Sequence, residues 1–218
     1  MTDMHPPVAR IRLRDGGEAE LRPIVPEDRA LLITGLEHMS AESRFARFGS
    51  GISHLSEAEL RYLTELDLVS HVAWGALIDD QPAGVGRYVA SEEPGCAEIA
   101  VAVVDRHQRR GLGRALFDSL VASARANGIK TLCFSIQPSN RSVLRMIRGV
   151  DVVLDQTEGM VTGRMSVDDI GPVANEELYA EVLARYRAAK EDGDRGRSTG
   201  GQSDSSTGSS SSDAELMQ

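Results

Sequence analysis

A glycine-punctuated, arginine-rich stretch is the part of the sequence best suited to bind a charged ligand. Residues 104–120 read VDRHQRRGLGRALFDSL, with two glycines where an apolar strand pattern gives way to a helical one. A glycine-rich turn leaves backbone N–H groups free at the positive end of a helix dipole, which favours phosphate groups. Arg109, Arg110 and Arg114 add cationic donors. The alternative interpretation is an ordinary strand-to-helix turn with solvated arginines.

A single carboxylate interrupts the apolar strand that precedes this loop. Residues 97–104 read AEIAVAVV, and Glu98 is the only charged residue among them. Buried carboxylates are uncommon unless they are paired or functional, so Glu98 is a candidate proton acceptor. The alternative is a strand-end residue paired with Arg87 or Arg141. His71 is a second candidate acid or base.

Other reactive residue types give no comparable signal. Cys133 occupies an apolar strand position and is expected to be a core residue, because a buried free cysteine behaves as a small hydrophobic side chain. No spacing of His, Cys and Asp matches a metal site, so no metal is predicted. The P-loop pattern and the Rossmann pattern of glycines are both missing.

The composition of the whole sequence is that of a soluble globular protein. The 218 residues carry a formal net charge of -9, which makes general nucleic-acid binding unfavourable and the arginines of the loop a local feature. Two cysteines are too few for a disulfide framework and fit a reducing compartment. The N-terminus has no apolar signal core, and no run reaches the ~18 apolar residues of a membrane span. The sequence therefore predicts a cytoplasmic protein that binds neither membranes nor nucleic acid.

The elements that must position the loop and the carboxylate come in mixed order. Their patterns are a strand period of two, a helical period of 3.6, turn glycines and a capping box. In chain order the expected elements are a hairpin around Asp15-Gly16-Gly17, a helix after residue 28, a helix opened by Ser56 and Glu59, two strands within 71–90, a strand at 97–104, a helix from the glycine loop to about Asn127, a strand at 130–136, a short helix within 139–149, a hairpin within 150–167 and a helix within 174–189.

This order predicts a single mixed α/β (α+β) domain over residues 9–168, with a central sheet. A C-terminal helix is expected within 169–190, packed on the domain. Residues 191–218 are rich in Ser, Gly and Asp and nearly free of large apolar side chains, so they are expected to be disordered. Residues 1–8 are expected to be loose as well.

The longer string around the loop resembles a known family. Gln108 to Gly113, QRRGLG, fits the Q/R-x-x-G-x-G/A signature of the GNAT superfamily of acetyl-CoA-dependent N-acetyltransferases. The preceding strand, the following helix ending in ANGI, a further strand and then Asn140 are in that family's order. The strings SRFARF, LSEAELRYLTELD, HVAWGAL, VGRYVA and AEIAVAVVDRHQRRGLGRAL resemble, more narrowly, the GNAT domain of bacterial protein lysine acetyltransferases.

The resemblance implies a GNAT fold, with helices on both faces of a sheet that splays between the strands at 97–104 and 130–136. The pantetheine arm of acetyl-CoA would lie in that slot, and Val103 and Val104 would pair with it instead of with a neighbouring strand. Asn140 would lie near the thioester, although Ser139 and Asn140 are also good helix caps. The residues expected to contact acetyl-CoA are Val103, Val104, Gln108, Arg109, Arg110, Gly111, Leu112, Gly113, Arg114, Ala115 and Asn140.

The resemblance also implies a reaction. A thioester is already activated, so a neutral amine can attack it directly, and the enzyme must supply a base because a lysine amine with a pKa of ~10.4 is charged at neutral pH. The AEIAV string resembles the strand that carries the family's glutamate base, which gives that role to Glu98. The family's tyrosine acid is replaced by Ile147, and the usual Gly-Phe that follows is Gly149-Val150.

Three functions are compatible with these residues. The first is acetyl transfer from acetyl-CoA to lysine side chains of proteins, as the narrower resemblance implies. The second is the same chemistry on a small amine. The third is a GNAT-fold module that binds acyl-CoA and regulates, with weak catalysis, which the missing tyrosine favours.

Overall fold

The computed structural model describes residues 7–48, 54–138, 140, 143–144, 147, 150–157 and 159–198. Its strands are β1 (Ala9–Arg12), β2 (Glu18–Pro23), β3 (His71–Ile78), β4 (Gln81–Ala90), β5 (Cys96–Val103), β6 (Thr131–Ile136), β7 (Val152–Thr157) and β8 (Met160–Ser166). Its helices are α1 (Arg29–Glu37), α2 (Ala41–Phe48), α3 (Glu57–Thr64), α4 (Leu112–Ala126) and α6 (Glu176–Ser198), with short 3-10 turns η1 (Pro26–Asp28) and η2 (Asp105–His107).

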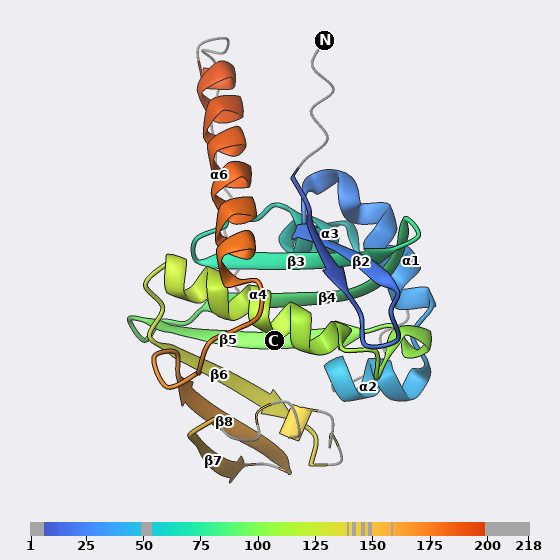
Figure 1. Ribbon diagram of the computed structural model, residues 1–218, viewed down its shortest axis with the longest axis vertical. Coiled ribbons are helices and arrows are strands. Elements are labelled where there is room, and N and C mark those ends of the chain that lie inside the picture. Colours follow the sequence, from blue (N-terminus) through green and yellow to red (C-terminus); the bar gives the residue numbers. More distant parts are fainter. Residues whose placement is uncertain are drawn as a thin grey trace.

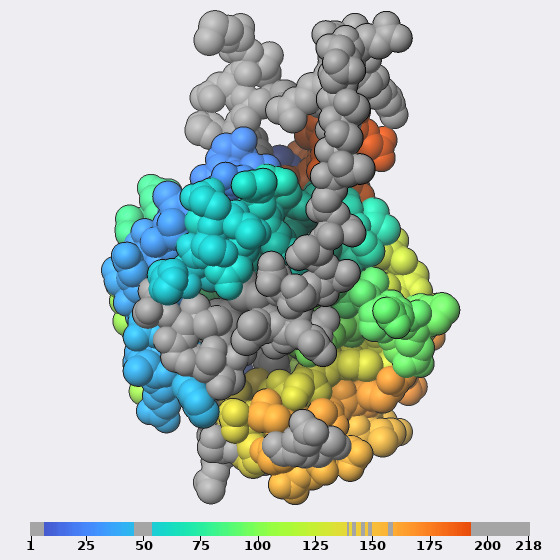
Figure 2. Space-filling model, turned by 180° about the vertical axis from the view of Figure 1, so that it is seen from behind, coloured from blue at the N-terminus to red at the C-terminus, as the bar shows by residue number. Residues whose placement is uncertain are grey.

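The described strands form one eight-stranded sheet in the order β1-β2-β3-β4-β5-β6-β8-β7. Neighbouring strands run antiparallel except β5 and β6, which are parallel because α4 crosses over between them. In Figure 1, α4 and α6 lie in front of the sheet. Figure 2 shows the opposite side, where α1 to α3 form the blue and cyan surface. The predicted mixed α/β fold with helices on both faces is therefore confirmed.

The core is built where α4 and α6 meet the middle of the sheet. Trp74 of β3 is fully buried, and its ring packs edge-on against Tyr179 of α6 with centroids 5.4 Å apart. The indole N–H of Trp74 donates to Ser123 Oγ of α4 at 2.9 Å. Gly86 of β4 permits close approach, since a Cβ there would lie 3.2 Å from Leu116 Cβ of α4. These contacts hold α4 firmly across β3, β4 and β5.

The local signals of the sequence agree with the elements observed. The hairpin of β1 and β2 turns at Asp15-Gly16-Gly17. The Ser56 hydroxyl accepts from Glu59 N–H at 3.2 Å, and the Glu59 carboxylate accepts from Ser56 N–H at 2.6 Å, which is the predicted capping box at the start of α3. Gly128 ends α4 with a φ of 71°. Most of the short helix expected within 139–149 lies outside the described residues.

The C-terminal helix is longer than the sequence predicts. Its buried residues are Tyr179, Val182, Leu183 and Tyr186, which lie within the expected range. However, α6 continues to Ser198, so the disordered tail predicted from Glu191 onward is wrong for residues 191–198. Residues 199–218 and 1–6 lie outside the described part of the chain. None of the described helices has a stretch long and apolar enough to cross a bilayer.

Candidate active site

The sheet opens between β5 and β6. β5 pairs with β4 along its length, up to Val103 opposite Gly84. Its parallel pairing with β6 covers only Cys96–Glu98 opposite Thr131–Cys133 and then ends, whereas β6 remains paired with β8 to Ile136. Beyond this point the facing edges of β5 and β6 carry backbone groups outside the ladder. From there the two strands diverge towards the start of α4 (Figure 1), which is the splay that the resemblance implies; the region between the parted strands is called the slot below.

The glycine loop lies at the wide end of this slot. Arg109 and Gly111 both adopt positive φ, 62° and 96°, and alternation of this kind turns successive backbone N–H groups towards one side. α4 begins at Leu112, and no described side chain caps its N-terminus. The first helical hydrogen bond is donated by Ala115 N–H to Gly111 O at 3.1 Å. The N–H groups of residues 112–114 are therefore available at the positive end of the helix.

The three arginines of the loop differ in how firmly they are held. Arg110 donates to the Asp15 carboxylate at 2.5 Å and lies 3.1 Å from His107 Nδ1. The hydrogen bond from Arg110 lowers the pKa of Asp15. Arg114 donates to Asp118 at 2.7 Å and lies over the Phe117 ring. The Arg109 side chain is exposed at the loop surface. Two guanidinium groups are thus oriented in advance, and the third is free to rotate.

Sequence reasoning missed the contribution of the β1–β2 turn. Arg14 N–H donates to Arg110 O at 3.0 Å, so the turn is joined to the loop by its backbone as well as by Asp15. The Arg14 side chain covers Gly111, where a Cβ would lie 3.3 Å from Arg14 Cγ. Arg14 therefore adds a fourth arginine beside the predicted phosphate site. Nothing in the local pattern around the turn signals a contact with residues almost a hundred positions away.

The N-terminus of α2 also braces the loop. The Asp105 carboxylate accepts hydrogen bonds from Ser40 N–H at 2.8 Å, Ser40 Oγ at 2.9 Å and Ser43 Oγ at 2.7 Å. Gln108 Nε2 donates to Ser43 Oγ at 3.3 Å and to Val103 O at 3.1 Å. In this structure Gln108, expected among the ligand contacts, fixes the loop against β5 and α2.

The backbone at the end of β5 departs from the prediction. Val104 N–H donates to Ala83 O of the neighbouring strand at 2.9 Å. The expectation that Val104 pairs with a ligand instead of with a neighbouring strand is therefore wrong for this donor, because the β4–β5 ladder continues one residue past β5. Val103 also remains opposite Gly84 of β4, and its carbonyl accepts from Gln108. Leu112 is a core side chain, so only its N–H faces the loop.

Glu98 lies where the slot begins. It is half-buried, and it is the last residue of β5 that pairs with β6, opposite Cys133. On its other side Glu98 is opposite Val89 of β4, and Arg87 is opposite Ala100, so Arg87 and Glu98 are diagonal neighbours on one face of the sheet. Burial lowers the pKa of the Arg87 guanidinium, and the charges of Tyr62 and Glu98 act in the opposite direction.

The position of Arg87 supports the alternative in which Glu98 pairs with an arginine. The other arginine considered, Arg141, lies outside the described residues. Arg87 is 5% exposed, and its guanidinium stands 5.4 Å from the centre of the Tyr62 ring. Arg87 therefore places a buried cation close to Glu98 on this face of the sheet.

His71 flanks this cluster and is neutral at pH 7. Its ring stands 4.8 Å from the Tyr62 ring, and its Nε2 is buried without a hydrogen-bond partner among the described residues. Burial, reinforced by the charge of Arg87, lowers the pKa of His71 to about 4. A neutral imidazole at this position can accept a proton but has little capacity to donate one at neutral pH.

This pKa predicts an acid sensitivity of the fold. An unfolded histidine has a pKa of ~6.5, so the unfolded chain takes up the proton first as the pH falls. The contribution of His71 to the free energy of unfolding should therefore be fully present above pH ~6.5. It should fall by up to ~3 kcal/mol as the pH drops from ~6.5 to 4. The melting temperature of the wild type is expected to fall more steeply over this range than that of His71→Phe. Parallel curves would show that His71 is protonated equally in both states.

Asn140 and Ile147 come after β6 in the chain. The Asn140 side-chain oxygen accepts from Val143 N–H at 3.3 Å, so the capping interpretation of this residue applies in the structure. Ile147, at the position of the family's tyrosine, is buried. No hydroxyl is supplied from that position, and Ser142 lies outside the described residues.

The cysteines are structural in their surroundings. Burial raises the pKa of the half-buried Cys133, which disfavours its nucleophilic thiolate form. Cys96 is buried and accepts a hydrogen bond from Arg164 at 3.2 Å. Over the described part of the chain, no group of three or more His, Cys, Asp or Glu side chains is placed to hold a metal ion.

Comparison with known proteins agrees with the slot and the loop. The model of the acetyltransferase (GNAT) family matches residues 38–149. The acetyltransferase PA5475 of Pseudomonas aeruginosa is 31% identical over 135 residues, covering 60% of this chain and 73% of the relative. The acetyltransferase Pat of Mycolicibacterium smegmatis is 27% identical over 188 residues, and the matched region covers 82% of this chain but only 54% of Pat.

A solved structure shares both sequence and fold. The GNAT domain of S. lividans PAT superposes with a TM-score of 0.68 at 30% identity, and the match covers 73% of this chain and 96% of that domain. The family match begins directly after α1 and spans Glu98, the glycine loop, α4 and β6. The chain therefore belongs to the GNAT family of acetyltransferases.

Proposed function

We propose that this protein transfers an acetyl group from acetyl-CoA to the ε-amine of lysine residues in proteins, with Glu98 as the general base. The observation that carries the proposal is the parting of β5 from β6 directly after Glu98, with the uncapped end of α4 at the other end of the same slot. In this arrangement phosphates would bind at one end of the slot, and the proton would be accepted at the other.

The residues present fit acetyl-CoA. The N–H groups from Arg109 to Arg114 would hold the pyrophosphate, because they lie at a helix N-terminus and in a loop with two positive φ values. Arg109, Arg110 and Arg14 would add charge there. The unpaired edges of β5 and β6 would hold the amide-bearing arm, as a strand is held in a sheet.

The chemistry divides between the co-substrate and the protein. Acetyl-CoA supplies an acyl carbon that is already activated as a thioester. Glu98 removes a proton from the attacking amine, directly or through one water, as the new N–C bond forms, the C–S bond breaks and the electron pair leaves on sulfur. The guanidinium of Arg87 beside Glu98 lowers the pKa of a nearby ammonium group by like-charge repulsion, which favours the reactive neutral amine.

Support for a protein acceptor comes from the sequence strings that resemble the GNAT domain of bacterial protein lysine acetyltransferases. The chain is also similar to the GNAT domain of S. lividans PAT and to the acetyltransferase Pat of M. smegmatis. Both resemble this chain through the region that contains Glu98 and the loop. The chain spans only about half the length of Pat, so the regulation of that whole protein is not carried over. Two free cysteines are compatible with a reducing compartment such as the cytoplasm.

The acceptor class can be tested by offering the two kinds of amine in parallel reactions. The purified protein would be given acetyl-CoA with a native cell lysate, and separately with a panel of polyamines, amino acids and aminoglycosides. Free thiol release and mass spectrometry of tryptic peptides would report turnover and acetylated lysines. We expect acetylated protein lysines well above the enzyme-free background. Turnover confined to a small amine would establish the second function, and binding without turnover the third.

A further inference from the structure

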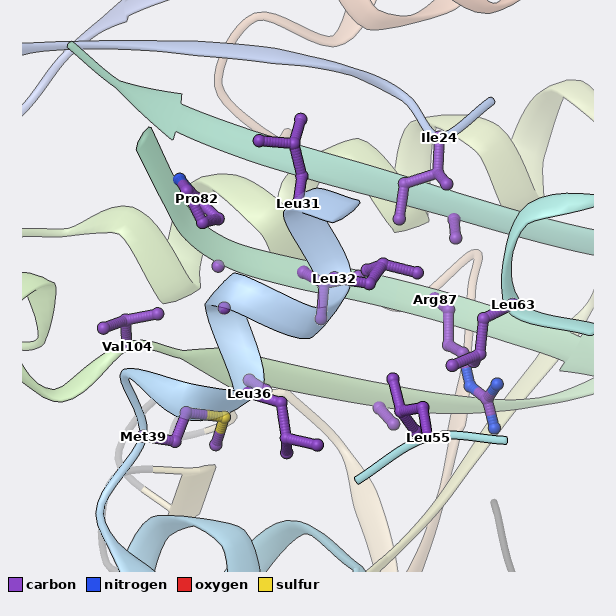
Figure 3. A pocket seen from close by; sticks show the side chains of 16 residues that line it. Ile24, Leu31, Leu32, Leu36, Met39, Leu55, Leu63, Pro82, Arg87 and Val104 are labelled. Carbon is purple, nitrogen blue, oxygen red and sulfur yellow. The ribbon is translucent and has the colours of Figure 1, made fainter. Parts of the chain in front are cut away.

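An apolar cavity lies between α1 and the sheet, on the face that carries Glu98. Its volume is about 90 Å³, and helix α1 crosses it as Figure 3 shows. Leu31 and Pro82 lie towards one end, and Leu55, Leu63 and Arg87 gather at the other. The described residues that line it are Ile24, Leu31, Leu32, Gly35, Leu36, Met39, Leu55, Leu63, Ala73, Pro82, Gly84, Val85, Arg87, Ala100, Ala102 and Val104.

This cavity and the slot share a wall. Ala100, Ala102 and Val104 line the cavity, and they belong to the stretch of β5 whose other edge has parted from β6. At one end the cavity reaches Arg87, which is opposite Ala100. The next pair on the same face is Val89 and Glu98, where the slot begins. The narrow end of the slot and this end of the cavity are therefore neighbours on one face of the sheet.

The lining disfavours the ammonium group of a lysine. Of the described residues that line the cavity, Arg87 is the only one with an ionisable side chain, and it is cationic. An acceptor lysine would have to bring its ammonium group into this apolar space and towards a second cation, which is unfavourable on both counts. A hydrocarbon chain meets neither penalty.

We propose that this cavity is an acyl-chain pocket, so that the protein accepts acyl-CoA donors longer than acetyl-CoA. The proposal rests on the proposed function, because it requires acyl-CoA to bind in the slot. A single water needs ~10–15 Å³ of such a volume, so a cavity of about 90 Å³ has room for several methylene-sized groups. Propionyl and butyryl chains, which are one and two methylene groups longer than acetyl, fit that space.

Binding without an acceptor tests the pocket separately from catalysis. Calorimetry would compare CoA, acetyl-CoA, butyryl-CoA, octanoyl-CoA and succinyl-CoA on the wild-type protein. Burial of two further methylene groups should make butyryl-CoA bind on the order of tenfold more tightly than acetyl-CoA. Succinyl-CoA should lose that advantage, because its carboxylate would enter an apolar space. Octanoyl-CoA is the longest donor of the series, against which the lining variants are compared. Butyryl-CoA binding no better than acetyl-CoA would overturn the proposal, as would a preference for succinyl-CoA.

Variants of the lining give the second test. Ala102→Leu places a branched chain in the cavity and should abolish the advantage of butyryl-CoA over acetyl-CoA. Met39→Ala widens it and should shift the best donor towards longer chains. Ile33→Phe is the matched control, since Ile33 lies on the exposed side of the same helix and should leave the ratio unchanged. Melting temperatures measured alongside identify any variant that has lost its fold.

The outcomes distinguish failure of the proposed function from failure of the acyl-chain pocket. If none of these thioesters binds, the proposed function fails. If acetyl-CoA binds but Ala102→Leu and Met39→Ala leave the order of the donors unchanged, only the acyl-chain pocket fails.

Discussion

Glu98→Gln is expected to lower the rate of acetyl transfer by ~10²–10⁴ and to leave acetyl-CoA affinity close to that of the wild type. The glutamine keeps the shape of the side chain and most of its hydrogen bonding, but it cannot accept the proton of the amine. Loss of a general base typically costs this much in rate. The wild-type pH–rate profile should show a rising limb that the variant loses or shifts towards the amine's own pKa.

Arg87 provides the check that separates a base from a structural carboxylate. If Glu98 served only to compensate the buried guanidinium, Glu98→Gln would leave that cation buried beside a neutral amide and would mainly lower the melting temperature. If Glu98→Gln turned over as fast as the wild type across pH 6–9 but lost much thermal stability, the role of Glu98 would be structural. The proton would then pass to water or to the neutral imidazole of His71.

Gly111→Asp should weaken acetyl-CoA binding by at least about a hundredfold. A carboxylate at this position would face the pyrophosphate at the end of α4, and two like charges a few ångströms apart near a protein surface repel by several kcal/mol. The positive φ of 96° also disfavours any side chain, and a Cβ there would press on Arg14. Calorimetry with acetyl-CoA measures the effect.

Gly128→Asp supplies the control for backbone strain. Gly128 ends the same helix with a φ of 71°, and a Cβ there would meet nothing within 4 Å. Its replacement should cost stability of the same kind without affecting the ligand site. If the wild type, Gly111→Asp and Gly128→Asp bound acetyl-CoA with equal affinity, the glycine loop would not be part of the binding site.

The sequence predicted those parts of the fold whose signals are local. The capping box of Ser56 and Glu59, the glycine turns and the strand periods each depend on residues a few positions apart, and each is confirmed. The extent of α6 was predicted less well, because composition marked residues 191–198 as tail while the helix continues to Ser198. Helical hydrogen bonds can continue past the last buried side chain, and no apolar period reports such an extension.

The site was predicted only where the resemblance or a local motif marked it. The glycine loop and Glu98 were proposed in this way, and the parting of β5 from β6 puts both beside one slot. Arg14, Asp15 and Asp105 were missed because their roles depend on contacts between distant segments. The engagement of Val104 N–H with Ala83 was missed for the same reason, since it depends on how far the β4–β5 ladder continues.

The most direct test of the central claim is a crystal structure of the protein with acetyl-CoA. We expect the pyrophosphate to bind the N–H groups of residues 109–114 and the pantetheine arm to lie between the parted edges of β5 and β6. The thioester should lie next to Glu98, on the face of the sheet that carries Arg87. Acetyl-CoA bound elsewhere on the protein, or a thioester on the opposite face of the sheet from Glu98, would contradict it.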